Sequence, residues 1–362
     1  MKQGVVYLEG RPIAHPMHRR FAEAVTEYID FIDVRMQWQD LGRSYLYNLI
    51  CWFVNAKYLS SKYKSQDIFL IDNLHFTPVI MNMLFARPRK KLVVHLGSHT
   101  LYFIREKKFS RLNSWLHKQA LQRYDALICE GQMAREIVTE LLGEKAPKTY
   151  VTFLGPPSER VKALQSIKYA NFSKVILIIA NGPSDFRLFY KGLDVMIKAF
   201  GLAANQIADI KLKILGAWNE DTIAKLLTGL EEHISSRISF EGSVTSIEDY
   251  LAEAGLCLHC SRGDAFPTST IEAMTAGVPV IVSESTGTKE VLELVDSRLI
   301  SSLDENQIAD KIIWFFELSE HEKLMLSAAC KREAENFTEE KAKEHYVKTF
   351  NNICKKLTLS RK

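Results

Sequence analysis

Two carboxylates and a short polar turn stand close together in the second half of the chain. Asp264 follows a strand-like apolar run at 255–259, and Glu272 lies eight positions later. Between them the pattern predicts a short helix that begins at Thr268 and ends at Gly277, a residue suited to a left-handed C-cap. A helix N-terminus offers N–H groups to phosphate, and a carboxylate can accept both hydroxyls of a ribose. The segment therefore combines the two kinds of group that a nucleotide-sugar site needs.

The same segment resembles a known donor-site signature. It reads Asp-Ala-Phe-Pro at 264–267, Glu-Ala-Met at 272–274 and Gly-Val-Pro-Val at 277–280. This pattern resembles the motif of the retaining glycosyltransferases of family 4 (glycosyl transferases group 1), which have the GT-B fold. Two residues depart from it. Asp264 replaces the usual Glu and is one methylene shorter, and Ala265 replaces the usual Gly, so the backbone is less free to adopt positive φ.

The resemblance implies a role for each polar residue of the segment. Glu272 would hold the ribose, and Asp264 would bind hydroxyls of the donor sugar or the region near them. The donor-binding set here is Phe266, Pro267, Thr268, Ser269 and Glu272, with backbone N–H groups near Thr268 and Ser269 helping to hold the diphosphate. Ser269 and Glu272 also have the spacing of a capping box, in which the acid only ties off the helix start.

Cations are expected after the first strand of the second half. The apolar run at 174–180 is followed by a loop and then by Lys191-Gly192. In the family, a Lys and an Arg hold the donor diphosphate. Lys191 matches the Lys, and Arg187 is the candidate partner, although the family's Gly-Arg pair is absent at 181–182. Two fixed cations would stabilise the charge that develops as the nucleotide leaves. The alternative is that both are solvated surface cations.

The first half supplies two further candidates. The strand at 91–95 ends in His95, which resembles the family histidine that contacts the transferred sugar near the reacting carbon. Gly10 follows the first strand, where a small residue lets the loop approach the sugar or acceptor. A structural role is the alternative for His95. The catalytic set is therefore His95, Asp264 and Glu272. No catalytic base emerges, and the resemblance implies a front-face mechanism in which the departing phosphate takes the acceptor proton.

Short apolar strands alternate with longer helical stretches along the whole chain, which is typical of α/β layers with parallel sheets. In the first half, strands are predicted at 4–8, 31–35, 68–72, 91–95, 126–129 and 149–153. In the second half, they are predicted at 174–180, 210–215, 237–241, 255–259, 279–283 and 298–300. Helices are predicted between them, for example at 17–29, 112–123, 132–142, 192–203, 221–229 and 246–253.

A chain of 362 residues is too long for one typical core, so two domains are expected. We expect Rossmann-like, doubly wound domains at 1–165 (acceptor side) and 172–336 (nucleotide-sugar donor side). In the GT-B fold such domains face each other across a cleft. A polar, helix-poor linker is predicted around 155–172. The resemblance also implies that a C-terminal helix at about 337–362 packs back on the first domain.

Composition places the chain among soluble globular proteins, with 47% hydrophobic and 25% charged residues. No signal peptide and no membrane-length apolar run is found, so a cytoplasmic location is expected. Cys257 and Cys260 have the spacing of a metal or redox pair. They lie on a predicted strand without a second pair, which favours a buried structural role. The chain also contains no Asp-x-Asp, the metal-binding motif of the other common glycosyltransferase fold, so no metal is expected.

Basic residues are concentrated at 87–123, where ten Lys or Arg accompany one acid, Glu106. Within 105–123, apolar residues near helical spacing alternate with cations, which suits peripheral contact with an anionic membrane on its inner face. The alternative is a surface helix that packs its apolar residues, Leu112 and Trp115 among them, into the core. No nucleic-acid-binding module is recognisable, so no nucleic-acid partner is expected.

The resemblance as a whole implies a metal-independent, retaining hexosyl- or other glycosyltransferase. It would move a sugar from a UDP- or GDP-sugar to an acceptor hydroxyl in the synthesis of cell-surface glycans, polysaccharides, glycolipids or lipid-linked oligosaccharides. No cofactor beyond this nucleotide-sugar co-substrate is expected. Two other classes stay open. A GT-B-type phosphorylase or nucleotide-sugar epimerase would turn the donor over without an acceptor, and a non-catalytic nucleotide-binding GT-B protein would bind without turnover.

Overall fold

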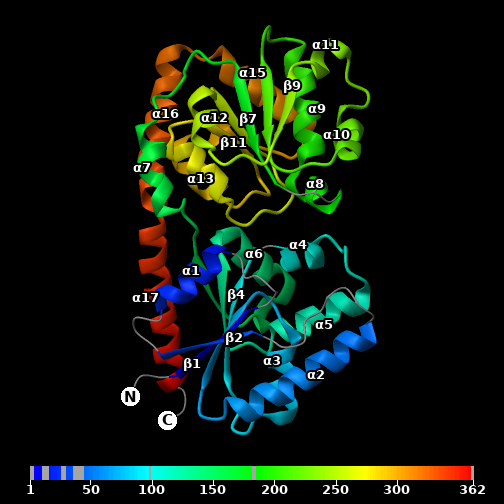
Figure 1. The fold of residues 1–362 in the computed structure, drawn as a ribbon, viewed down its shortest axis with the longest axis vertical. Coiled ribbons are helices and arrows are strands. Elements are labelled where there is room, and N and C mark those ends of the chain that lie inside the picture. Colours follow the sequence, from blue (N-terminus) through cyan, green and yellow to red (C-terminus); the bar gives the residue numbers. More distant parts are fainter. Residues whose placement is uncertain are drawn as a thin grey trace. The chain divides into compact units, whose positions relative to one another are not determined.

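The chain forms two compact units, each built around a parallel sheet (Figure 1). The computed structural model describes residues 4–9, 16–25, 30–35, 45–97, 99–181 and 185–359. Unit 1 comprises Met1–Thr152 and Ala342–Lys362, and unit 2 comprises Phe153–Lys341. Both units are α/β layers with parallel strands, which confirms the fold class predicted from the alternation of strands and helices.

The sheet of unit 1 has six parallel strands in the order β2-β1-β3-β4-β5-β6. Its strands are β1 (Gly4–Glu9), β2 (Asp30–Arg35), β3 (Ile68–Asp72), β4 (Lys91–Leu96), β5 (Ala126–Glu130) and β6 (Lys148–Thr152). Every residue of β3 and β5 is buried. A strand that helices cover on both faces needs apolar residues at successive positions, which is why these strands read as continuous apolar runs.

The helices of unit 1 connect its strands in sequence order. They are α1 (Pro16–Val25), α2 (Tyr45–Lys62), α3 (Phe76–Ile80), the π-helix η1 (Met81–Phe85), α4 (His99–Arg105), α5 (Arg111–Leu121), α6 (Gly131–Leu142) and the 3₁₀ turn η2 (Gly143–Lys145). The long C-terminal helix α17 (Glu339–Leu359) joins unit 1 from Ala342 onward. Its Tyr346 stacks on Phe21 of α1, with ring centroids 5.1 Å apart.

The sheet of unit 2 has the order β12-β11-β10-β7-β8-β9, again with all pairs parallel. Its strands are β7 (Val175–Ile179), β8 (Lys211–Leu215), β9 (Ile238–Gly242), β10 (Leu256–His259), β11 (Val280–Ser283) and β12 (Ile300–Ser301). The chain starts at β7, runs outward to β9, and then returns to β10 on the other side of β7. This reversal of direction is the doubly wound arrangement that was predicted.

The helices of unit 2 lie on both faces of this sheet. They are α7 (Ser158–Ser166), α8 (Asp185–Lys191), α9 (Leu193–Ala204), α10 (Glu220–Leu227), α11 (Glu232–Ser235), α12 (Glu248–Glu253), α13 (Thr268–Thr275), α14 (Lys289–Val295), α15 (Glu305–Glu317) and α16 (Glu320–Ala334), with 3₁₀ turns η3 (Ser297–Leu299) and η4 (Glu335–Phe337). Figure 1 shows α9 and α10 on one side and α13 and α16 on the other. Side-chain caps fix several starts, including the reciprocal capping box of Ser319 and Glu322 on α16.

Two predictions about local structure differ from what is observed. The stretch at 155–172, predicted as a helix-poor linker, contains α7, and residues 153–165 belong to unit 2 rather than to the first domain. Helix α7 packs against α13, and its Leu164 is fully buried, so tertiary contacts support a sequence with weak helical periodicity. The strand predicted at 298–300 is mostly a 3₁₀ turn, and only Ile300 of it pairs in β12.

Candidate functional site

The candidate site lies in unit 2, where the order of strands reverses between β7 and β10. Open α/β sheets bind ligands beyond the carboxyl ends of their strands at such a point, because the connections on either side diverge there. After β7 the chain reaches α8, which ends in Lys191, and β10 ends in His259. The fold therefore brings a cation and an imidazole to the edge of the sheet where a ligand is expected.

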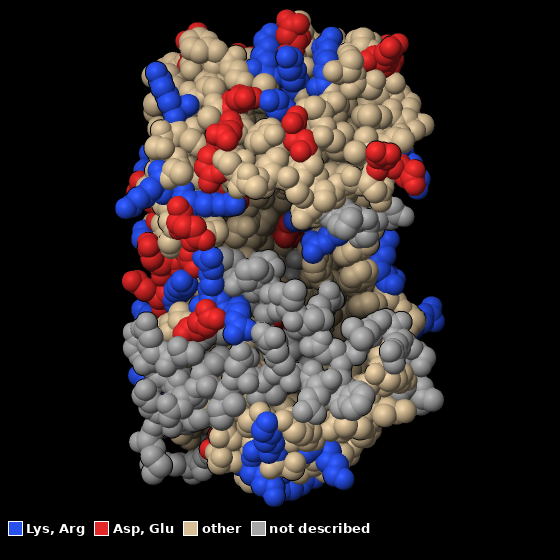
Figure 2. All heavy atoms as spheres, in the orientation of Figure 1, with Lys and Arg blue, Asp and Glu red and all other residues tan. Residues whose placement is uncertain are grey.

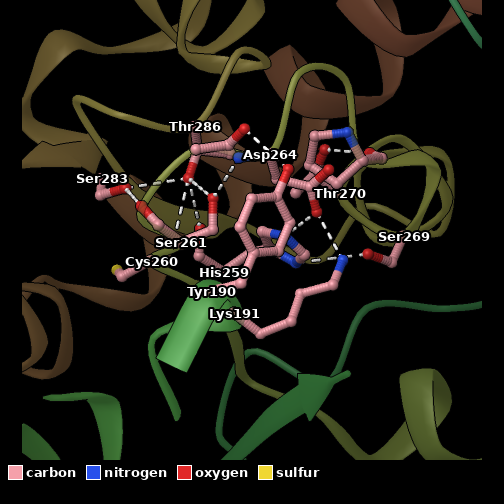
Figure 3. Close-up of polar contacts among 12 residues, drawn as sticks. Tyr190, Lys191, His259, Cys260, Ser261, Asp264, Ser269, Thr270, Ser283 and Thr286 are labelled. Atoms are coloured by element: carbon pink, nitrogen blue, oxygen red, sulfur yellow. Dashed lines mark hydrogen bonds and ion pairs between the residues drawn. The ribbon is translucent and has the colours of Figure 1, made fainter. Parts of the chain in front are cut away.

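Four polar side chains form a chain of contacts at this edge, as Figure 3 shows. Nζ of Lys191 lies 2.5 Å from Oδ2 of Asp264, and Nε2 of His259 lies 3.1 Å from the same oxygen. Nδ1 of His259 lies 3.4 Å from Oγ of Ser269 in the first turn of α13. Helix α8, strand β10, the turn after it and α13 thus each contribute one member to a single polar chain.

The electrostatics of this cluster favour an ionised Asp264. Burial alone would raise its pKa, but the charge of Lys191 and the His259 hydrogen bond outweigh burial and hold the pKa of Asp264 well below its usual range. Burial lowers the pKa of His259, and Asp264 only partly opposes this effect. The imidazole is therefore neutral at pH 7. We assign its proton to Nε2 because that nitrogen faces the carboxylate.

A buried hydroxyl network holds the turn that carries Asp264 (Figure 3). Oγ1 of Thr286 lies 2.9 Å from the hydroxyls of both Ser261 and Ser283. Oγ of Ser261 in turn accepts a 3.0 Å hydrogen bond from the backbone N–H of Asp264. These hydroxyls are fully buried, and a satisfied buried network costs little and fixes the backbone. The Asp264 carboxylate is therefore placed by a rigid support.

Two glycines allow the closest approaches around the site. Gly192, directly after Lys191, has φ +70°, and a Cβ there would lie 2.0 Å from the carbonyl oxygen of Cys260. At Gly287 a Cβ would lie 1.5 Å from the carbonyl oxygen of Ala265. Any larger residue would push α8 away from β10, or residue 287 away from the turn. The packing of the backbone therefore requires a glycine directly after Lys191.

Side-chain contacts from the turn also fix the end of α8. Arg262 forms a bidentate ion pair with Asp194, at 2.8 and 2.7 Å, and its guanidinium lies 3.9 Å from the ring centroid of Phe189. The hydroxyl of Tyr190 donates to the carbonyl oxygen of Gly263 at 2.8 Å. These contacts flank Lys191 in the sequence, so they limit the positions that its ammonium group can reach.

Glu272 lies on α13 and does not cap it. The N-cap residue is Pro267, no side chain caps this end, and Ser269 is the second residue of the helix. The capping-box alternative is therefore wrong. Instead, Oε1 of Glu272 lies 3.3 Å from a guanidinium nitrogen of Arg160 on α7. Burial raises the pKa of Glu272, and Arg160 opposes that effect.

The predicted left-handed cap at the end of α13 is present, with Gly277 at φ +80°. Ala265, the other departure from the usual pattern, is not among the described residues with positive φ, so its Cβ causes no backbone strain. Phe266 is buried and faces Phe153 and Phe337, with ring centroids 6.4 and 5.6 Å apart. Its side chain therefore supports the turn.

Arg187, Gly10, Thr268 and Ser269 are the remaining residues predicted to bind the donor. Arg187 lies on α8, one helical turn before Lys191, and is partly exposed. The sequence analysis predicted it in a loop, whereas the structure has it in a helix. The helix therefore determines the orientation of its side chain. Gly10 lies outside the described residues. Thr268 and Ser269 form the first turn of α13 and are partly exposed, so their backbone N–H groups are at the site edge.

His95 belongs to unit 1 and is enclosed there. Its side chain is 3% exposed, and Nε2 lies 3.5 Å from Oε1 of Glu130 at the end of β5. The ring also contacts Tyr346 of α17, at 5.3 Å between centroids. The histidine is at the carboxyl end of β4, as predicted, next to a buried carboxylate that the sequence analysis did not select.

Sequence reasoning missed three residues that the fold brings to the candidate site, namely His259, Arg160 and Arg262. His259 lies within the Cys257–Cys260 spacing, directly before the turn that carries Asp264, and this position is the signal that could have identified it. Both cysteines are buried, and burial raises the pKa of each thiol, so they are structural. Within the described residues, no group of His, Cys, Asp and Glu is arranged to hold a metal ion.

Comparison with known proteins agrees with this geometry. The model of the family described as glycosyl transferases group 1 matches residues 173–317. N-acetyl-alpha-D-glucosaminyl L-malate synthase of Bacillus anthracis is 28% identical over 184 residues, which are 50% of this chain and 46% of that protein. Phosphatidyl-myo-inositol mannosyltransferase of Mycobacterium leprae is 25% identical over 210 residues, 56% of this chain and 51% of that protein. The chain thus spans about half the length of these curated relatives.

Solved structures are similar over nearly the whole chain. Sucrose-phosphate synthase of Thermosynechococcus elongatus has a TM-score of 0.73 at 16% identity, covering 99% of this chain and 100% of that one. Anabaena HepE in complex with UDP and glucose has a TM-score of 0.68 at 18% identity, covering 97% and 100%. These likenesses establish the GT-B fold. Residues 173–317 therefore resemble the glycosyl transferases group 1, the chain as a whole has the GT-B fold, and its similarity to the two curated glycosyltransferases is consistent with family 4.

Proposed function

We propose that the chain is a retaining glycosyltransferase that moves a hexosyl or related sugar from a nucleotide sugar to an acceptor hydroxyl. One observation carries this proposal. Lys191 and Asp264 form a partly buried ion pair at the strand-order reversal of a Rossmann-like sheet, at the start of the helix that carries Glu272. A cation beside a helix N-terminus suits a diphosphate, and a buried carboxylate one turn further suits the hydroxyls of a ribose.

Each residue has a role in the proposed reaction. Lys191 and Arg187 hold the diphosphate together with backbone N–H groups near Thr268 and Ser269. Glu272 accepts hydrogen bonds from the ribose, and Asp264 from hydroxyls of the donor sugar. His95 of unit 1 is kept as a proposed sugar contact, which would require movement of its enclosed ring.

The proposed chemistry is a front-face displacement. The acceptor oxygen bonds to the anomeric carbon on the same face from which the diphosphate leaves, and the leaving phosphate oxygen takes the acceptor proton. The ammonium of Lys191 then stabilises the negative charge on the diphosphate, which lowers the barrier to departure. In this scheme the cations of the chain support the leaving group, so we propose a metal-independent reaction.

A UDP-sugar is the donor that the comparisons favour, since HepE was solved with UDP and glucose, and a GDP-sugar is the alternative. The name of one relative includes phosphatidyl-myo-inositol, which agrees with a lipid-linked or glycolipid acceptor. A part in cell-surface glycan or polysaccharide synthesis stays a prediction.

Peripheral membrane contact in the cytoplasm is part of the same proposal. Leu112 and Trp115 of α5 are 60% and 56% exposed, so these two are not packed in the core as the alternative required. Cations at Lys107, Lys108 and Arg111 lie beside them in the sequence. Figure 2 shows charges of both signs interspersed over the visible face of unit 2, and a group of Lys and Arg at the lower end of the view. No described helix is long and apolar enough to cross a bilayer.

The proposal is tested with purified protein and a panel of UDP-, GDP-, ADP- and CMP-sugars. Thermal-shift measurements would find the donor that stabilises the chain, and nucleotide release would be followed with and without sugar or lipid acceptors. NMR of the product would report whether the anomeric configuration is retained.

The outcomes separate the classes of function. Acceptor-dependent release with retention supports the proposal, and inversion contradicts its mechanism. Release that does not depend on an acceptor favours a phosphorylase or epimerase. Binding without any turnover favours a non-catalytic nucleotide-binding protein.

A further inference from the structure

Arg160 forms an ion pair with Glu272 of the candidate site, although the two residues are far apart in the sequence. Its guanidinium contacts Oε1 of Glu272 at 3.3 Å across 112 residues of sequence. It also lies 3.9 Å from Oε1 of Glu248 on α12. Figure 1 shows α7, which carries Arg160, beside α13. Three helices of unit 2 thus meet at one guanidinium.

Glu272 needs such a partner. Its side chain is 8% exposed, and a carboxylate removed from water loses hydration that its ionised form requires. An ionised carboxylate accepts hydrogen bonds at both oxygens, whereas in a protonated carboxyl one oxygen carries a proton and acts as a donor. The protonated form is therefore a poorer acceptor for two ribose hydroxyls than the ionised form. Binding of a ribose by Glu272 therefore depends on what keeps the carboxylate ionised.

The charged groups that face Glu272 come from neighbouring helices. Arg160 of α7 favours the ionised form, and Glu248 of α12 disfavours it. On α16, which packs against α13, Lys331 is occupied with the carbonyl oxygens of Gln165 and Ile167, at 3.3 and 2.9 Å. The cation in contact with the Glu272 carboxylate is therefore Arg160.

Contacts hold both the guanidinium of Arg160 and the helix that carries it. Glu248 lies on the other side of the guanidinium, so the group sits between two carboxylates. The start of α7 is held by Glu339, whose Oε2 accepts hydrogen bonds from the N–H and the hydroxyl of Ser158, at 2.7 and 3.0 Å. An anion at a helix N-terminus also has a favourable interaction with the helix dipole.

We propose that Arg160 is a positioning residue for the donor: it keeps the Glu272 carboxylate ionised and oriented to accept the hydroxyls of the nucleotide ribose. This inference rests on the proposed function, because it assigns the ribose to Glu272. The inference adds a residue that lies outside the Asp264–Glu272 motif. This residue is on α7, the first helix after the chain enters unit 2. Arg160 acts through Glu272 and is not required to touch the sugar.

The test measures nucleotide binding by calorimetry on the full chain. UDP, GDP, ADP and CDP are titrated into the wild type, and the best of them is compared with its 2′-deoxy form. The variants are Arg160→Ala, Arg160→Lys and the control Lys162→Ala, which removes an exposed cation from the same helix. Circular dichroism of each variant confirms that it folds.

Each variant has an expected result. Arg160→Ala weakens binding of the ribonucleotide by about ten- to a hundred-fold, and the loss grows as pH falls from about 8 to about 5.5, because a carboxyl without its cation protonates at higher pH. It binds the ribonucleotide and the deoxynucleotide nearly equally. Arg160→Lys restores part of the discrimination, and Lys162→Ala behaves as the wild type.

The outcomes also separate this inference from the proposed function. If the wild type binds one nucleotide and Arg160→Ala keeps both its preference for the ribonucleotide and its pH profile, the role of Arg160 is disproved while the donor site stands. If the wild type binds none of the four nucleotides, the proposed function fails and this inference fails with it.

Discussion

Nζ of Lys191 and Oδ2 of Asp264 are 2.5 Å apart, although 73 residues separate them in the sequence. The pair joins the end of α8, which follows β7, to the turn that follows β10. Because β7 and β10 are neighbours at the reversal of the sheet, the two residues meet where a Rossmann-like sheet receives its ligand. We propose that this ammonium, paired to a partly buried carboxylate, exchanges part of that contact for the diphosphate of a bound donor.

Replacing Lys191 with Met removes the charge and keeps most of the side-chain volume. We expect nucleotide-sugar turnover to fall by about a hundred- to a thousand-fold, since the leaving diphosphate loses its fixed cation. The Asp264 carboxylate also loses its main partner, so the melting temperature falls. Steady-state kinetics and thermal unfolding would measure both effects. Lys198→Met, which removes an exposed cation of α9, is the matched control, and turnover by Lys191→Met within twofold of this control would contradict the prediction.

The buried His259 predicts a specific pH dependence of stability. Its pKa is lowered from the ordinary 6.5 by burial, so below about pH 6.5 the unfolded chain binds a proton that the folded chain does not. The contribution of His259 to the free energy of unfolding is therefore fully present above about pH 6.5 and is lost as the pH falls below that value. We expect the melting temperatures of the wild type and His259→Gln to converge, or to cross, between about pH 7.5 and pH 5.5.

Thermal unfolding over this range, monitored by circular dichroism, is the measurement. His117 and His345 also have lowered pKa values, but they are common to both proteins, and so the difference between the two isolates His259. A constant gap between the curves would show that His259 titrates alike in the folded and unfolded chain.

Gly287 is predicted to be irreplaceable. A Cβ at this position would lie 1.5 Å from the carbonyl oxygen of Ala265, so Gly287→Ala must displace the turn that carries Asp264. We expect a loss of about 1–3 kcal/mol in the free energy of unfolding and weaker nucleotide binding.

Gly201→Ala on α9 is the control for this substitution, because its Cβ would meet only side-chain atoms, those of Leu230 at 3.1 Å and of Ile234 at 3.9 Å. It should change stability by less than about 1 kcal/mol. Denaturant titration of the two variants tests the contrast, and equal stabilities would argue against it.

The exposed Leu112 and Trp115 predict membrane binding through α5. Leu112→Ser with Trp115→Ser should reduce sedimentation with phosphatidylglycerol-containing vesicles by about tenfold, because the apolar area that enters the interface is lost. Added salt should weaken the binding of the wild type, since cations beside these residues contribute. The control pair is Leu324→Ser with Met325→Ser, which removes comparable exposed residues from unit 2. Equal loss in both double variants would indicate non-specific adsorption.

The sequence by itself determined the layers of this protein. Buried parallel strands must be continuously apolar and end at polar turns, and that local requirement located β3 at 68–72 and placed most other strands within one or two residues. The Asp264–Glu272 motif and the Gly277 cap were also readable, because they depend on residues within one turn and one helix. Helix α7 was missed because its start and packing depend on Glu339 and α13, which are distant in the sequence.

Only the tertiary structure decided which distant groups meet. Local patterns do not encode the order of strands, and it is this order that brings Lys191 to Asp264. The packing of α7 on α13 sets Arg160 against Glu272. Burial then determined the charge states, since desolvation and the nearest ion decide whether a carboxyl or an imidazole is ionised. The sequence alone thus located the motif and its strands, and the fold supplied the partners that give its residues their chemistry.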